Sequence, residues 1–94
     1  MSTDPTFRMT VADVFAISGL GTVAAGHIDQ GTINVGDRVW LHGSDRPVKT
    51  AVSFIQAGAT GAKTAGAGQA VGLVLRGLAV DRVQVGNVVS ASEI

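Results

Sequence analysis

Two histidines are the side chains in this sequence best suited to acid–base or metal chemistry. His27 and His42 have no cysteine or paired acidic residue beside them. A metal ion needs several ligands, and a general base must lie within hydrogen-bond reach of the proton that it takes. We therefore expect both histidines to be exposed strand residues, and we expect no metal site.

Serine chemistry has equally little support. Ser18, Ser44 and Ser53 do not lie in a G-x-S-x-G setting, where a strained turn exposes a nucleophilic hydroxyl. No pair of carboxylates stands out for acid–base work. Since no base, nucleophile or ligand set can be named, we expect no catalytic activity and no cofactor. An enzyme that uses a groove for a small substrate is kept as an alternative.

A glycine motif, Gly19-Leu-Gly-Thr-Val-Ala24, matches the G-x-G-x-x-A pattern of dinucleotide-binding turns. That function requires a helix to begin here, so that its first amides face a phosphate. The residues that follow are β-branched and are ended by Gly26. The motif therefore favours a turn between two strands.

The segment from Ala57 to Thr64 superficially resembles a phosphate-binding loop around Lys63. The two glycines that such a loop requires are alanines here, at positions 57 and 62. Those glycines allow the backbone turn that aims amide groups at phosphate. We therefore expect a loop of small residues.

The elements that would position these side chains are short strands between glycines. Phe7, Met9 and Val11 alternate with polar residues, which is the pattern of a half-buried strand. The alternation is interrupted at Ala12-Asp13, which suggests a bulge. No segment has the apolar periodicity of a helix. The expected strands are 7–17, 22–30, 37–42, 48–56, 69–76 and one within 82–90, with a tight connection at 31–36 and a loop at 57–68.

Composition limits the class of protein further. The chain has 94 residues, no cysteine, 7 basic and 7 acidic residues, and is 46% hydrophobic. This length supports one domain, and the neutral charge argues against strong nucleic-acid binding. No segment resembles a membrane span or a signal peptide. We expect a cytoplasmic protein without a membrane association.

Four blocks of sequence, in order and with similar spacing, resemble the second domain of elongation factor Tu and related translational GTPases. The resemblance implies a six-stranded Greek-key antiparallel β-barrel over residues 7–94, preceded by a disordered tail at 1–6. Only six residues precede the first block, so we expect a stand-alone barrel without the GTPase domain. The blocks are Phe7–Val23, Gly26–Asp37, Ala67–Gly77 and Val83–Val89.

The resemblance also implies a pocket, which in elongation factor Tu holds the terminal adenosine of aminoacyl-tRNA. Its apolar parts fall at Ile17, Gly19, Val23 and Val74. Its polar parts are replaced: the family's glutamate falls at Gln56, an arginine at Ala59 and an asparagine at Ala70. A further arginine, which faces the GTPase domain, falls at Leu20.

Loss of these polar groups lowers the affinity expected for phosphate. An exposed Leu20 instead favours an apolar contact from which water is excluded. We therefore expect a non-catalytic binding module with a protein partner. The alternative is translation-related binding of an RNA 3′ end, for which Arg8, Lys49, Lys63 and Arg76 would supply charge. Self-association through exposed strand edges is another alternative.

Overall fold

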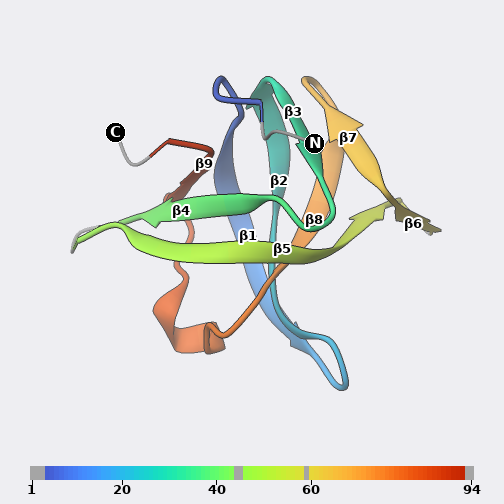
Figure 1. Cartoon of the computed structure of the whole chain (residues 1–94). Coiled ribbons are helices and arrows are strands. Elements are labelled where there is room, and N and C mark those ends of the chain that lie inside the picture. Colours follow the sequence, from blue (N-terminus) through green and yellow to red (C-terminus); the bar gives the residue numbers. More distant parts are fainter. Residues whose placement is uncertain (1–3, 44–45, 59, 93–94) are drawn as a thin grey trace.

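The computed structural model describes residues 4–43, 46–58 and 60–92, and its regular secondary structure is almost entirely β-strand (Figure 1). The expected all-β fold is confirmed. The strands are β1 (Arg8–Ile17), β2 (Gly21–Gln30), β3 (Thr32–Asn34), β4 (Arg38–His42), β5 (Val48–Ala57), β6 (Thr60–Ala62), β7 (Thr64–Gly66), β8 (Ala70–Leu75) and β9 (Val88–Ser90), with one 3-10 turn, η1 (Val80–Arg82).

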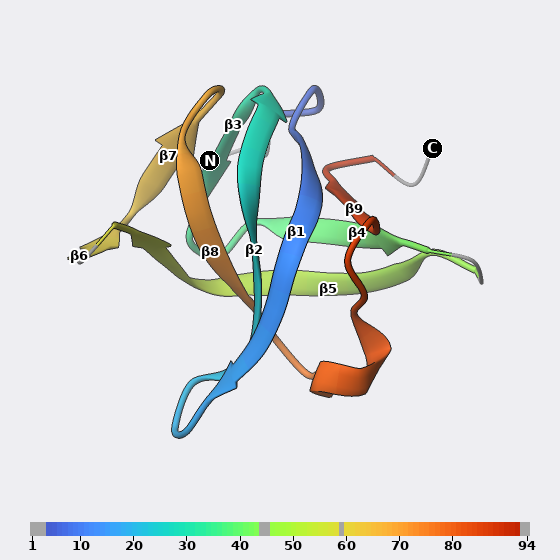
Figure 2. The ribbon, with the colours of Figure 1, turned by 180° about the vertical axis from the view of Figure 1, so that it is seen from behind.

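Six of these strands pair around a ring. The sheet order is β4-β9-β1-β2-β8-β5-β6, and an additional pairing of β4 with β5 brings the ring back to its first strand. All of these pairings are antiparallel. Figures 1 and 2 show the strands from opposite sides, with β4 and β5 crossing one side of the ring and β1, β2 and β8 the other. These six ring strands are the six expected from the sequence.

The connections follow the Greek-key pattern expected for this barrel. The chain passes from β2 to β4, and later from β8 to β9, without joining neighbours in the ring. One face of each strand points into the ring and forms the main core. Its fully buried side chains include Phe7, Met9, Ile28, Ile55 and Leu73. Burial of this apolar surface is the dominant force that stabilises the ring.

A bulge lies in β1 where the sequence predicted one. The pairing of β1 with β2 changes register between Val11 and Asp13. The extra residue is Ala12, which is exposed. A bulge increases the local twist of a strand, and here the second half of β1 continues into a long hairpin with β2.

Two segments expected to be irregular contain strands, so this part of the prediction was wrong. The connection at 31–36 includes β3, and the loop at 57–68 includes β6 and β7. β3 pairs with β7 in a separate two-stranded sheet, and β6 pairs with the end of β5. Each of the three has only three residues, which is too short for an alternating pattern to identify a strand.

The N-terminal segment meets the turn between β2 and β3. The carboxylate of Asp4 accepts hydrogen bonds from the amide and hydroxyl of Thr6, at 2.9 and 2.7 Å, and from the amide of Thr32 at 3.1 Å. Residues 1–3 lie outside the described ranges, so the boundary at Phe7 stays a prediction. No helix in the described ranges is long and apolar enough to cross a membrane.

Candidate functional site

Two valines expected in the binding pocket lie side by side on the outside of the ring. Val23 of β2 is directly opposite Val74 of β8. Their chain neighbours Ala24 and Leu73 belong to the main core, and successive side chains of a strand point to opposite faces. Val23 and Val74 therefore point outward, yet they are only 1% and 3% exposed.

Two phenylalanines flank this pair and account for its burial. Phe15 of β1 is directly opposite Val23, and Phe54 of β5 is directly opposite Val74. Side chains that face each other across antiparallel strands share one face of the sheet and touch. The four form a row, which we call the outer apolar row. Phe15 is 40% exposed, so one end of the row is open to solvent.

A depression of about 370 Å³ lies beside this row. Gln56 and Ala70, both expected in the pocket, are among the residues that line it, together with Phe15, His27 and Gly72. Gln56 is directly opposite Gly72. Of the expected pocket residues, Gln56 and Ala70 therefore line the depression, whereas Val23 and Val74 lie beside it in the outer apolar row.

Gly72 makes this close arrangement possible. A Cβ atom at this position would lie 2.9 Å from Cγ1 of Val23, which is closer than carbon atoms can pack. The methyl group of Val23 therefore occupies the space that a side chain at position 72 would need. The glycine forms the floor of the depression because only hydrogen fits there.

The remaining pocket residues follow the β1–β2 hairpin toward its tip. Ile17 is half-buried at the end of β1, and its carbonyl accepts a hydrogen bond from the amide of Leu20 at 3.0 Å. Gly19 has a φ of 86°, a conformation that favours glycine in this turn. Leu20 is 46% exposed at the tip. Figures 1 and 2 show the hairpin extending beyond the ring.

The depression beside the outer apolar row has no strongly basic residue in its described lining. Arg8 lines a different depression, beside His42. Lys49 and Arg76 line another on the outside of β4 and β5. Lys63 lies between β6 and β7, where its carbonyl accepts a hydrogen bond from the amide of Val35 at 2.9 Å. Ala59, expected at the place of a family arginine, lies outside the described residues.

The two histidines are on different strands and in different surroundings. His27 is exposed on β2, as expected, and lines the depression. His42 on β4 is half-buried, so the expectation that it is exposed was wrong. Its Nε2 lies 2.8 Å from Oγ of Ser90 and 3.0 Å from the carbonyl oxygen of Ser92. These contacts come from the last residue of β9 and from the segment after it, which the sequence did not place beside His42.

This histidine–serine pair has the separation of a base and a nucleophile, but its hydrogen bonds run the wrong way. A carbonyl oxygen only accepts, so the Nε2 atom of His42 that contacts Ser92 must carry hydrogen in the arrangement assigned from this network. The hydroxyl of Ser90 in turn donates to the same carbonyl at 2.5 Å. No lone pair of His42 Nε2 is then available to take the proton of Ser90. The pair fastens the end of β9 to β4.

The first glycine motif is a turn followed by a strand, as expected. Gly21 through Ala24 belong to β2, so no helix begins after the first motif. Within the described ranges, no group of three His, Asp or Glu side chains could hold a metal ion.

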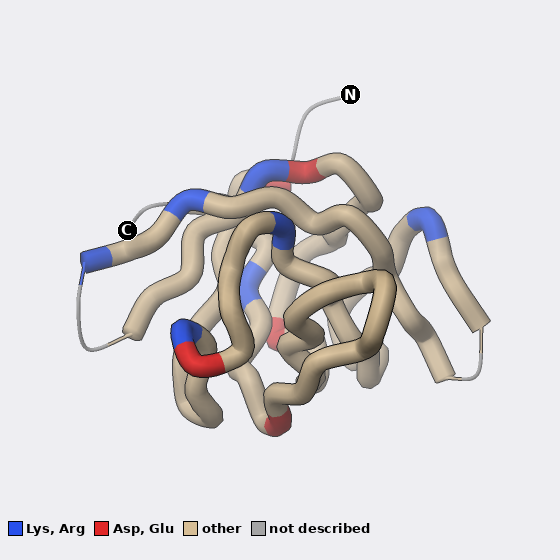
Figure 3. Tube along the Cα trace, turned by 90° about the horizontal axis from the view of Figure 1, so that it is seen from below, with Lys and Arg blue, Asp and Glu red and all other residues tan. Residues whose placement is uncertain are grey.

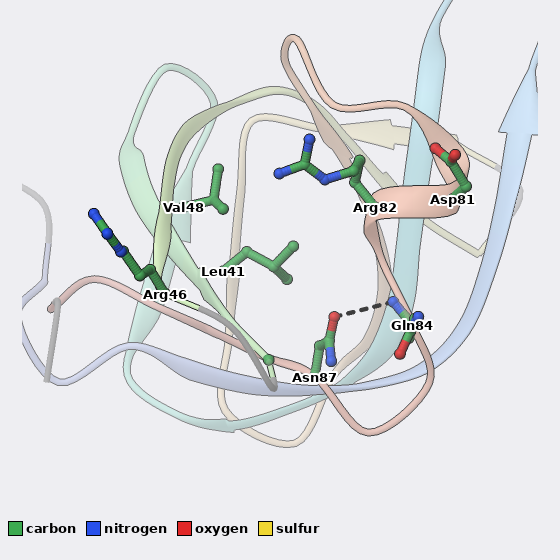
Figure 4. Close-up of a pocket in the computed structure, with 8 residues that line it drawn as sticks. Leu41, Arg46, Val48, Asp81, Arg82, Gln84 and Asn87 are labelled. Atoms are coloured by element: carbon green, nitrogen blue, oxygen red, sulfur yellow. Dashed lines mark hydrogen bonds between the residues drawn. The ribbon is translucent and has the colours of Figure 1, made fainter.

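A separate depression of about 200 Å³ lies between the β4–β5 hairpin and η1 (Figure 4). Leu41 and Val48 form its apolar side. Figure 4 shows Arg82 reaching over it toward Val48, whereas the guanidinium of Arg46 points away. Asp81 is also part of the lining. The two cationic groups are too divergent in this arrangement to hold one small anion together.

Phe15 and Phe54 are the residues of the candidate site that sequence reasoning missed. Both belong to the four aromatic residues of the chain. The sequence could have identified Phe15. One residue separates Phe15 from Ile17, so in an extended segment both side chains lie on the same face of the strand. For Phe54 there was no such signal, since its place beside Val74 depends on which strands are neighbours.

A ring of six antiparallel strands with β1–β2 and β4–β5 hairpins defines a small Greek-key β-barrel domain. The chain belongs to the family described as Elongation factor Tu domain 2, whose sequence model matches residues 21–90. The match covers β2 through β9 and therefore most of the strands that form the candidate site. The resemblance noted in the sequence is thereby confirmed at the level of the family.

Proposed function

We propose that this domain is a non-catalytic cytoplasmic module that binds a protein partner through its first hairpin. The contact surface, which we call the hairpin surface, consists of Phe15, Ile17 and Leu20. The observation that carries the proposal is the exposure of two large apolar side chains on one projecting element. Phe15 is 40% exposed and Leu20 is 46% exposed.

The position of Leu20 supports a dry contact. The resemblance implies that the family has an arginine here, facing the GTPase domain. A leucine cannot form the ion pairs of an arginine, but its burial against an apolar partner is favourable by about 25 cal/mol per Å² of apolar surface removed from water. The partner expected is therefore a protein with a complementary apolar patch.

The composition of the neighbouring depression supports a protein more than a nucleic acid. Its lining contains small and apolar residues together with His27 and Gln56. Nucleic-acid affinity depends mainly on lysine and arginine groups that contact phosphates. The cationic residues Arg8, Lys49 and Arg76 line other depressions.

The test is affinity capture from native lysate with the intact chain as bait, followed by the same experiment with Leu20→Asp. We expect at least one protein whose recovery falls by about tenfold or more, since an aspartate buried in an apolar contact is costly. Val35→Asp is the matched control, because Val35 is 42% exposed on the connection between β3 and β4.

The control variant should recover the partner as well as the unaltered chain does. Leu20→Asp should change the free energy of unfolding by less than about 0.5 kcal/mol, since the side chain lies at an exposed turn. Recovery of no protein, or equal recovery with both variants, would refute the hairpin surface as the contact.

A second function is favoured by the position of Gln56 and Ala70 in the lining of one depression, beside the outer apolar row that holds Val23 and Val74. These positions match the pocket that the resemblance implies, so a single-stranded RNA 3′ end is the alternative ligand. Titration of the labelled protein with a CCA-ended oligonucleotide, followed by NMR, tests it. Shifts confined to these residues and Ile17 would support RNA binding, and unchanged signals would reject it.

A further inference from the structure

Three cationic residues surround one small side chain on the outside of β4 and β5. Ala51 is directly opposite Arg38 in the pairing of the two strands. Lys49 lies two residues before Ala51 and therefore on the same face of β5. The amide of Arg76 donates a hydrogen bond to the carbonyl of Ala51 at 2.9 Å. We call Arg38, Lys49 and Arg76 the cation triangle.

The cation triangle encloses a depression. Its volume is about 290 Å³, and the lining consists of the three cationic residues with Thr50 and Ala51. The hydroxyl of Thr50 donates to the carbonyl of Arg76 at 2.6 Å, which fixes the end of β8 against β5. The backbone positions of Lys49 and Arg76 relative to each other are therefore determined by strand hydrogen bonds.

No acidic side chain neutralises this cluster in the described part of the chain. The lining contains no carboxylate, and none of the three cationic groups has an ion pair there. Asp37, the chain neighbour of Arg38, is only 8% exposed, and its carboxylate accepts a hydrogen bond from the amide of Asn34 at 2.9 Å. Figure 3 shows the Lys and Arg positions along the Cα trace together with the Asp and Glu positions.

An aromatic ring adjoins the triangle. Trp40 is directly opposite Lys49, and Nζ of Lys49 lies 5.9 Å from the centroid of its ring. A cation at this distance is attracted to the ring face. The three positive charges repel one another and raise the energy of the unliganded surface. An anion that enters the cation triangle relieves this repulsion. It can also draw the ammonium group of Lys49 away from the ring of Trp40.

We propose that the cation triangle binds a phosphate group. Two guanidinium groups offer the forked donors that match phosphate oxygens, and the ammonium group adds a point charge. The half-buried Trp40 provides a surface on which a base attached to that phosphate can stack. The ligand class is thus a phosphate monoester, carried either by a free nucleotide or by the 5′ end of a nucleic-acid strand. This site is separate from the hairpin surface.

Fluorescence gives a direct test, because Trp40 is the only tryptophan and the chain has no tyrosine. The intact chain is titrated with inorganic phosphate, with uridine 5′-monophosphate and with a short 5′-phosphorylated single strand, all at constant ionic strength. We expect a saturable change in emission. Tighter binding of the nucleotide than of phosphate would show that the ring takes part, and still tighter binding of the strand would identify a strand end as the source.

Two variants and a control make the test specific. Arg76→Gln and Arg38→Gln should each weaken phosphate binding by about tenfold, which is the loss expected for one charge-assisted contact. Lys63→Gln removes an exposed charge between β6 and β7 and should leave the affinity unchanged. Circular dichroism shows whether each variant is folded. The proposal is overturned if none of the three ligands gives a saturable signal, or if Lys63→Gln weakens binding as much as Arg76→Gln.

Discussion

Gly72 is the residue on which the shape of the candidate site depends most strongly. Val23, whose methyl group fills the space above it, is 1% exposed and cannot turn into solvent. Its side chain is enclosed by its neighbours in the outer apolar row, so any atom added at position 72 must displace part of that row.

We therefore predict that Gly72→Ala destabilises the fold by about 1–3 kcal/mol, the usual cost of overpacking. Gly66→Ala is the matched control, because a Cβ atom at position 66 would have no neighbour closer than 3.9 Å. Chemical denaturation measures both. Equal stabilities of the two variants would show that Val23 can move without cost.

Ser90 provides a residue-level test of whether the domain lacks catalytic activity. In the tautomer assigned to His42 from its contacts, Nε2 carries hydrogen, so the hydroxyl of Ser90 is not activated as a nucleophile. We predict that a fluorophosphonate probe does not label the protein and that Ser90→Ala hydrolyses p-nitrophenyl acetate at the same rate as the unaltered chain. Labelling that disappears in Ser90→Ala would contradict this role of the pair.

At the scale of elements, the six strands of the ring could be predicted, whereas the short strands β3, β6 and β7 could not. β1 begins with apolar residues at alternate positions up to Val11, and β2 lies between Gly21 and Gly31, which is sufficient to identify them. β6 and β7 consist of alanine, glycine, threonine and little else, so they lack the side chains that distinguish a strand from a loop. Their strand geometry comes from pairing with β5 and β3, which is a tertiary effect.

The candidate site was predictable to the extent that it follows the family pattern. Gln56 and Ala70 line one depression, and Val23 and Val74 pair on the outer surface beside it, so the pocket itself stays a prediction. The cation triangle could not be predicted, because Arg38 on β4, Lys49 on β5 and Arg76 just after β8 are brought together only by the order of the strands in the ring. Their sequence spacing carries no sign of this proximity.

The link between the N-terminal segment and the β2–β3 turn should depend on pH. Hydrogen bonds from the amide and hydroxyl of Thr6 lower the pKa of the Asp4 carboxyl from its ordinary value of 3.8. A lowered pKa means that folding favours the ionised form. The stabilisation is therefore present at neutral pH and is lost as the pH falls below 3.8 through the pKa of the folded state.

We predict that the amide signal of Thr32, which donates to Asp4, titrates with a midpoint below 3.8 in an NMR experiment. Asp4→Asn should abolish this titration, because the amide side chain does not ionise in this range. A midpoint at or above 3.8 would mean that the carboxylate does not accept these hydrogen bonds in solution.

At the scale of the whole molecule, β9 completes the ring although it has only three residues. Val89 is fully buried and is paired with Met9 of β1 on one side and with Leu41 of β4 on the other. The strand thus joins the two halves of the core, and a defect in it should affect the cooperative stability of the entire domain.

Val89→Asp should destabilise the domain by roughly 3 kcal/mol or more, since it places a carboxylate without a partner in the core. Val88→Asp changes the neighbouring residue, which is half-buried on the outer face beside Arg8 and His42. Its cost should be below about 1 kcal/mol. Urea denaturation of both variants tests this, and a similar cost for the two would contradict the role of β9 in the ring.

The most direct test of the proposed function is site-specific photo-crosslinking from the hairpin surface in native lysate. A photoreactive residue at position 20 should give one dominant adduct with a partner protein, whereas the same residue at position 35 should not. No adduct from position 20, or the same adducts from both positions, would contradict the proposal that the hairpin docks a protein. An adduct at twice the mass of the chain would assign this surface to self-association instead.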